Sequence, residues 1–243
     1  MIPTSPAHEV GVAAHLVVRG IGLETELRID GEDGHHLQRV RRLRLREHLT
    51  VADGVGNWRR YIVTGVTSGT LEIAAVAEAH FETLANREVT IAAALSKGTK
   101  LENVAMHLTE LGVSGIRPLQ MARSVVRLDA LGAGRLKARL EAAVRAGAMQ
   151  SRRAWLPTVW HVAGIESLTE IENLLVAAHD GDLSAIDAIE PGSAVTIVSG
   201  PEGGIEATER GYFASIGARS WSLGDYVLRA ETAPLVATVR ALV

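Results

Sequence analysis

The sequence contains no cysteine, and this absence excludes several kinds of chemistry. Disulfide bonds, thiolate metal ligands and a cysteine nucleophile are all ruled out. Aromatic residues are scarce as well, at 4% of the 243 residues, although 47% of the chain is hydrophobic. The core therefore has to consist mainly of Ala, Val, Leu and Ile.

Long apolar runs are missing too, since none approaches the roughly 18 residues that span a membrane. Residues 1–6 lack both the basic and the apolar region of a signal peptide. The formal net charge of −3 argues against indiscriminate coating of nucleic acid, although it leaves room for a local basic patch. We expect a cytoplasmic protein without a membrane partner.

The first part of the chain has the pattern of short strands, at 15–18, 49–52, 58–66 and 70–76. The last two are expected to form a hairpin around Ser68-Gly69. Between the first strands, the three-residue spacing of Leu37, Val40 and Leu43 predicts a helix over 35–43. We interpret this part as a small β-barrel-like domain, followed by a linker at 78–88.

A basic cluster lies in this part of the chain. It comprises Arg39, Arg41, Arg42, Arg44, Arg46, Arg59 and Arg60. Such a cluster can neutralise phosphates, or it can be a solvated face held by salt bridges. The nearby histidines have no acidic partners at ligand spacing, so we expect no metal site.

The second part of the chain alternates strands and helices. Strands are predicted at 89–95, 116–119, 174–178, 195–198 and 220–223, and helices at 101–111, 131–149 and from 233 onward, with Thr232 as an N-cap. The run at 89–95 is apolar except for Thr90, which is typical of a strand buried on both faces. This alternation indicates an α/β domain with a largely parallel sheet.

Three loops are expected to meet at the carboxyl edge of that sheet, where such folds bind ligands. They are Gly200-Pro201-Glu202-Gly203-Gly204, the stretch 223–233, and the turn that follows the strand at 89–95. The nucleotide fingerprints G-x-x-x-x-G-K-[ST] and G-x-G-x-x-G are absent. Because Glu202 places a carboxylate in the first loop, a neutral or cationic ligand is favoured over a phosphate.

Further motifs run along the whole chain. They are Gly34-His35-His36-Leu37, Val40-Arg41-Arg42-Leu43, Asp53-Gly54, Lys97-Gly98, Thr109-Glu110-Leu111-Gly112-Val113, Arg123-Ser124-Val125-Val126, and Gln150-Ser151-Arg152-Arg153. Together with the two glycine-containing loops, in this order, they resemble the SPOUT-class RNA methyltransferases. Within that class the sequence is similar to the family that methylates N3 of a uridine in 16S small-subunit ribosomal RNA.

The resemblance implies a SPOUT α/β domain with a deep trefoil knot over residues 81–243, and a PUA-like RNA-binding β-barrel over residues 1–80. It implies a homodimer, with ribosomal RNA or the small ribosomal subunit as partner and S-adenosyl-L-methionine as cofactor. The residues expected at the cofactor are Leu95, Val198, Ser199, Gly200, Pro201, Glu202, Gly203, Gly204, Leu223, Gly224, Val227, Leu228 and Thr232. The residues expected to contact RNA are Arg39, Arg41, Arg42, Arg44, Arg59, Arg60, Arg123 and Arg152.

The residues also constrain the reaction. Methylation of pyrimidine C5 usually proceeds through a cysteine adduct, so the lack of cysteine favours methylation of nitrogen or oxygen. N3 of uracil must lose a proton, and a cation can stabilise the negative charge on the ring oxygens. Arg229 is the first candidate for this role, with Glu231 orienting it or acting as base. A salt bridge that caps the last helix is the structural alternative for this pair.

Three positions depart from the family pattern. His107 stands where a lysine is common, Tyr226 where a basic residue is common, and Glu206 where a helix-capping serine is usual. Two other functions stay open at this point. One is methylation of a different RNA, such as a ribose 2′-oxygen of tRNA, and the other is a non-catalytic RNA-binding assembly factor.

Overall fold

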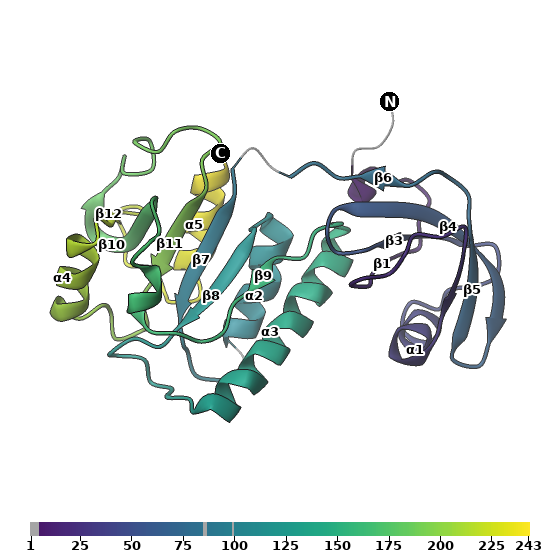
Figure 1. The fold of residues 1–243 in the computed structure, drawn as a ribbon, viewed down its shortest axis with the longest axis horizontal. Coiled ribbons are helices and arrows are strands. Elements are labelled where there is room, and N and C mark those ends of the chain that lie inside the picture. The colour runs from purple at the N-terminus through teal and green to yellow at the C-terminus, as the bar shows by residue number, and fades with distance from the viewer. Residues whose placement is uncertain (1–4, 85–86, 99) are drawn as a thin grey trace. The chain divides into compact units, whose positions relative to one another are not determined.

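The computed structural model describes residues 5–84, 87–98 and 100–243 (Figure 1). The chain forms two compact units. The first contains residues 1–83 together with Ala148–Leu156, and the second contains Leu84–Gly147 and Pro157–Val243. The sequence predicted a single boundary at residue 80, and it did not indicate that Ala148–Leu156 belongs to the first unit. Among the described residues, no helix is both long and apolar enough to cross a membrane.

The first unit is built on a six-stranded sheet in the order β1-β3-β4-β5-β2, with β6 paired to β4. The strands are β1 (Ala14–Val17), β2 (Glu26–Ile29), β3 (His48–Ala52), β4 (Asn57–Thr67), β5 (Thr70–Ala75) and β6 (His80–Phe81). The predicted hairpin is confirmed, because β4 and β5 pair antiparallel on either side of a turn in which Gly69 has a φ of 80°. Buried Leu16, Leu49 and Tyr61 belong to the core of this unit.

The helix of this unit begins and ends earlier than predicted. α1 covers Gly31–Arg39, and Val40 beyond it is 65% exposed. Leu37 and Leu43 both reach the core, but Leu43 does so from the loop after the helix. In that loop Arg42 has a φ of 54°, a left-handed conformation that a helix does not continue through. The leucine spacing therefore identified buried positions but not the helix boundaries.

The second unit contains a six-stranded sheet in the order β12-β10-β11-β7-β8-β9, parallel throughout. Its strands are β7 (Val89–Ala94), β8 (Gly115–Leu119), β9 (Thr158–Val159), β10 (Leu174–Asp182), β11 (Val195–Ser199) and β12 (Arg219–Trp221). Its helices are α2 (Lys100–Leu111), α3 (Ala130–Ser151, whose last turn belongs to the first unit), α4 (Ala207–Ser215) and α5 (Ala233–Leu242). The parallel α/β prediction is confirmed.

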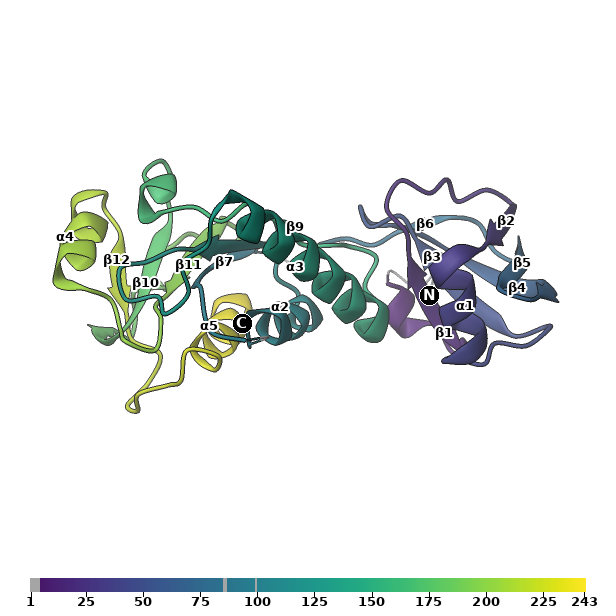
Figure 2. The same cartoon turned by 90° about the horizontal axis from the view of Figure 1, so that it is seen from below.

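Helices cover both faces of this sheet, as the apolar run in β7 requires. Val89 and Ile91 point into a core shared with α2, α3 and α5. Ala92, on the opposite face, packs in a second core with Phe213 of α4. Figure 2 shows α2 and α5 side by side on one side of the sheet, with α4 further along at the β12 edge. Ile91 and Ala92, on opposite faces of β7, are both fully buried because each face is covered by packed side chains.

The predicted linker at 78–88 is partly strand. Phe81 of β6 pairs with Asn57 of β4, which extends the first unit to residue 83. Residues 85–86 of the predicted linker lie outside the described residues.

Candidate active site

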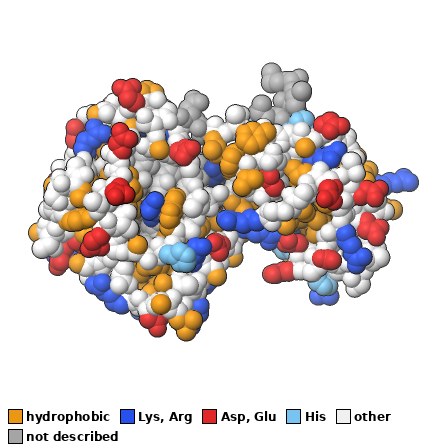
Figure 3. Space-filling model, in the orientation of Figure 1, with side chains coloured by type: hydrophobic (Ala, Val, Ile, Leu, Met, Phe, Trp, Pro, Cys, Tyr) orange, Lys and Arg blue, Asp and Glu red, His pale blue; other side chains and the backbone are white. Residues whose placement is uncertain are grey.

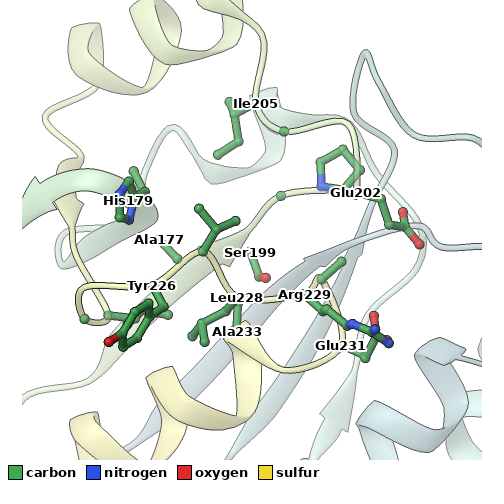
Figure 4. A pocket seen from close by; sticks show the side chains of 18 of the residues that line it. Ala177, His179, Ser199, Glu202, Ile205, Tyr226, Leu228, Arg229, Glu231 and Ala233 are labelled. Carbon is green, nitrogen blue, oxygen red and sulfur yellow. The ribbon is translucent and has the colours of Figure 1, made fainter.

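A cavity of about 630 Å³ lies at the carboxyl ends of β10 and β11 (Figure 4). This volume falls in the range of small-molecule sites. The wall combines the end of β10, the loop after β11, the loop after β12 and the first residues of α2 and α5. Its lining residues are Lys100, Ala177, Ala178, His179, Ser199, Gly200, Pro201, Glu202, Gly204, Ile205, Arg210, Leu223, Gly224, Tyr226, Val227, Leu228, Arg229, Ala230, Glu231 and Ala233.

Both glycine-containing loops singled out in the sequence therefore line one cavity. Most residues expected at the cofactor lie in its wall, and so do Arg229 and Glu231. Four do not. Leu95 and Val198 are buried in the cores behind the wall, and Gly203 and Thr232 lie beside it. The helix-capping hydrogen bond expected from the Thr232 side chain is absent, since that residue already has helical φ and ψ.

The first loop requires glycine for two different reasons. At Gly200, an added Cβ would lie 2.7 Å from Cγ1 of Ile205, so a side chain would displace the cavity wall. At Gly204 the φ is 73°, and its N–H donates to the carbonyl oxygen of Pro201 at 2.8 Å, closing a tight turn. In the second loop Gly224 has a φ of 139°, again a glycine conformation.

A buried carboxylate anchors the helix that follows the first loop. Glu209, only 6% exposed, accepts hydrogen bonds from the backbone N–H groups of Glu206 at 3.0 Å and Ala122 at 2.7 Å. The first bond satisfies a free donor at the start of α4, and the second ties in the loop after β8. Arg123 of that loop donates through Nη1 to the carbonyl oxygen of Gly203 at 3.0 Å.

Charged side chains gather at one side of the cavity. Nζ of Lys100 lies 3.4 Å from Oε1 of Glu202 and 3.9 Å from Oε2 of Glu231. Nη1 of Arg229 lies 3.9 Å from Oε1 of the same Glu231, and the Arg229 side chain is 84% exposed. Figure 4 shows Glu202, Arg229 and Glu231 together, away from His179 and Tyr226.

A separate ion pair joins Arg210 of the cavity wall to Asp180. Nη1 of Arg210 is 2.9 Å from Oδ1 of Asp180, and the hydrogen bond from this guanidinium is the main cause that lowers the pKa of the Asp180 carboxyl. Arg210 comes from α4 and Asp180 from the end of β10, so the pair joins two elements around the cavity.

Sequence reasoning missed the contribution of β10. Ala177, Ala178 and His179 line the cavity, yet they belong to no recognisable motif. A signal was present, because a parallel strand predicted at 174–178 must end at the same sheet edge as its neighbours. Lys100 was missed too, since it belongs to none of the motifs that identify the loops of the cavity.

Of the eight arginines expected at RNA, Arg123 belongs to the second unit and is bound to the carbonyl oxygen of Gly203, and the other seven, all in the first unit, fall into two groups. Arg39, Arg41, Arg42 and Arg44 are exposed around the end of α1. Arg59, Arg60 and Arg152 are instead bound within the first unit: Arg59 to the carbonyl oxygens of Leu23 and Ala77, Arg60 to Glu9, and Arg152 to the carbonyl oxygens of Glu9 and Val12. Figure 3 shows basic and acidic side chains interspersed on the visible face of each unit.

The fold and the cavity define a parallel α/β protein with a cavity of small-molecule size at the carboxyl ends of its strands, joined to a separate β-sheet unit. Residues 83–242 match the RNA methyltransferase domain family, and residues 29–75 match the RNA methyltransferase PUA domain family.

Individual relatives agree with this class. The chain is 34% identical over 219 residues to the ribosomal RNA small subunit methyltransferase E of Mycobacterium bovis, covering 86% of this chain and 83% of that one. It is 31% identical over 221 residues to the Bacillus subtilis protein of the same name, covering 86% of each. The crystal structure of the ribosomal RNA small subunit methyltransferase E from Neisseria gonorrhoeae, bound to S-adenosyl methionine, superposes on this chain with a TM-score of 0.83. The two are 26% identical, and the superposition covers 93% of this chain and 95% of the Neisseria chain. The chain belongs to the RNA methyltransferase family that includes ribosomal RNA small subunit methyltransferase E.

Proposed function

We propose that this protein transfers a methyl group from S-adenosylmethionine to N3 of a uridine in small-subunit ribosomal RNA. The observation that carries the proposal is that the two loops with family-like motifs line a single cavity of cofactor size. The family membership supports the choice of RNA and of methyl transfer. The position N3 rests on the motif resemblance and on the lack of a cysteine nucleophile.

The residues of the cavity fit this cofactor. Gly200, Gly204 and Gly224 keep the wall free of side chains, so backbone groups can approach a ligand closely. Glu202 and Glu231 offer carboxylates to a ligand that carries positive charge, and Ile205 and Leu228 supply apolar surface. When bound, S-adenosylmethionine supplies an electrophilic methyl group on a sulfonium. Leu95 and Val198 act by supporting the wall from behind.

Arg229 and Glu231 are proposed to act on the target base. The exposed guanidinium of Arg229 meets the negative charge that develops on the uracil oxygens when N3 loses its proton. Glu231, one-third exposed and 3.9 Å from Arg229, orients that guanidinium. Much of the rate comes from holding N3 in line with the methyl group.

The rest of the assembly is proposed on the same basis. The exposed arginines Arg39, Arg41, Arg42 and Arg44 of the PUA-like domain, residues 1–80, neutralise RNA phosphates. The SPOUT domain, residues 81–243, holds its cofactor loops in a trefoil knot, forms a homodimer, and works in the cytoplasm.

The test compares ribosomal RNA from cells with and without the gene, digested to nucleosides and quantified by mass spectrometry. We expect N3-methyluridine to disappear in the deletion and to return when the gene is restored. Unchanged N3-methyluridine would refute the choice of target. Calorimetry with S-adenosylmethionine separates a methyltransferase, which binds the cofactor, from an RNA-binding assembly factor, which does not.

A further inference from the structure

Lys100 is a charged residue of the cavity wall that neither the motifs nor the proposed chemistry uses. It is the first residue of α2, directly after the turn that follows β7. Its ammonium group contacts a carboxylate from each of the two loops, Glu202 at 3.4 Å and Glu231 at 3.9 Å. Those loops leave different strands of the sheet, and no backbone pairing joins them at these residues among the described hydrogen bonds.

We propose that Lys100 is a positioning residue that fastens the two cofactor loops to each other across one side of the cavity. This inference rests on the proposed function, since it assumes that the cavity holds S-adenosylmethionine. Without the ammonium group, Glu202 and Glu231 would face each other as like charges, and both loop ends would separate. The cavity would then bind the cofactor less tightly although its wall residues are unchanged.

The geometry at Glu231 adds a second role. Its Oε2 faces Lys100 and its Oε1 faces Arg229, so one carboxylate is shared between two cations. Sharing weakens the hold on Arg229, whose side chain is 84% exposed and able to turn toward RNA. Without the Lys100 ammonium group, the Glu231 carboxylate pairs with Arg229 alone. The stronger attraction then draws the guanidinium toward the protein and away from RNA. Lys100 thereby affects cofactor binding and turnover together.

The experiment measures the Kd for S-adenosylmethionine and the kcat on RNA for Lys100→Met, which keeps the apolar stem, and Lys100→Arg, which keeps the charge. Lys137→Met is the matched control, because it removes a lysine ion pair away from the cavity, between Nζ of Lys137 and Oε1 of Glu141 on α3 at 2.9 Å. We expect Lys100→Met to raise the Kd about three- to tenfold and to lower kcat, as loss of two partly exposed ion pairs would. Lys100→Arg and Lys137→Met should stay within about twofold of the wild type.

The salt dependence of the Kd distinguishes this electrostatic role from a purely structural role of the lysine. The ratio of the Kd of Lys100→Met to that of the wild type should shrink as NaCl rises to about 1 M, because screening removes the same attraction. The double variant Glu202→Gln/Lys100→Met should lose less binding free energy than the sum of the losses in the two single variants. A loss in Lys100→Met that Lys100→Arg does not restore, or that persists undiminished in high salt, would overturn the inference. Failure of the wild type to bind S-adenosylmethionine would instead refute the proposed function.

Discussion

Acidification should destabilise the first unit through a single buried histidine. His15 of β1 is 4% exposed, and its two ring nitrogens lie 2.7 Å from Oγ1 of Thr50 and 3.1 Å from the carbonyl oxygen of Arg153. The carbonyl requires a donor, so Nε2 carries the hydrogen and Nδ1 accepts from the Thr50 hydroxyl. The neutral ring is thus satisfied on both sides, and a second proton on Nδ1 would place an extra charge in the core and force the Thr50 hydroxyl to turn from donor to acceptor.

Burial lowers the pKa of His15 from 6.5 to about 4, and the nearby positive charge of Arg152 adds to this effect. The unfolded chain therefore takes up the proton at a higher pH than the folded chain does. The stabilisation that depends on neutral His15 is complete above pH 6.5 and is lost as the pH falls from 6.5 through 4. By linkage, the loss is about 2 kcal/mol at pH 5 and about 3 kcal/mol at pH 4.

The assay is urea unfolding followed by tryptophan fluorescence, at pH 7 and pH 5, for the wild type and for His15→Gln. Gln can keep both hydrogen bonds but does not titrate. We expect the wild type to lose about 2 kcal/mol more than the variant between these two pH values. His8→Gln, a change at an exposed histidine of the same unit, is the control and should behave as the wild type. Equal losses in the wild type and His15→Gln, or an NMR titration midpoint of His15 near 6.5, would refute the reasoning.

Three further predictions concern the second unit. Gly200→Val should weaken S-adenosylmethionine binding at least tenfold by calorimetry, because its Cβ would lie 2.7 Å from Cγ1 of Ile205. Gly203→Val, which lies outside the cavity wall, should weaken binding less. The reverse order of the two Kd values would contradict the site geometry. Arg229→Ala should lower kcat at least tenfold while leaving the melting temperature within about 1 °C, since the side chain is 84% exposed, and full activity would remove it from the mechanism. Glu209→Gln should reduce the free energy of unfolding by about 2 kcal/mol in urea, because a buried amide cannot accept both backbone hydrogen bonds, and an unchanged midpoint would contradict that role.

Local pattern was sufficient for most of the second unit. Nearly continuous apolar runs, interrupted by Thr90 and Thr196, mark β7 and β11 because strands covered on both faces need no polar face. Glycine marks the loops for a reason that is also local, since the φ of Gly204 and Gly224 disfavours other residues. The two loops of the cavity could therefore be identified from the sequence, together with the sheet edge where they lie.

The local sequence pattern was not sufficient where a side chain binds to residues that lie far away in the sequence. Arg59 and Arg152 look like RNA contacts in a basic sequence, yet distant backbone carbonyls bind both guanidinium groups. α1 was misplaced because Leu43, which fits the leucine spacing, lies in the loop after the helix. Inside α1, Gly34 is present although glycine is a poor helix former by propensity. It is required there because a Cβ would collide with the carbonyl oxygen of Gly69 in another turn.

By itself, the sequence determined the class of the protein: an α/β domain with a ligand edge, a basic β-sheet domain, and chemistry without a cysteine. Only the tertiary structure decided which charges share the cavity. Lys100, Glu202 and Glu231 come from segments far apart in the chain, and they meet because parallel strands deliver their loops to one edge. Spacing along a sequence carries no information about such a meeting, since it depends on how the whole sheet is ordered.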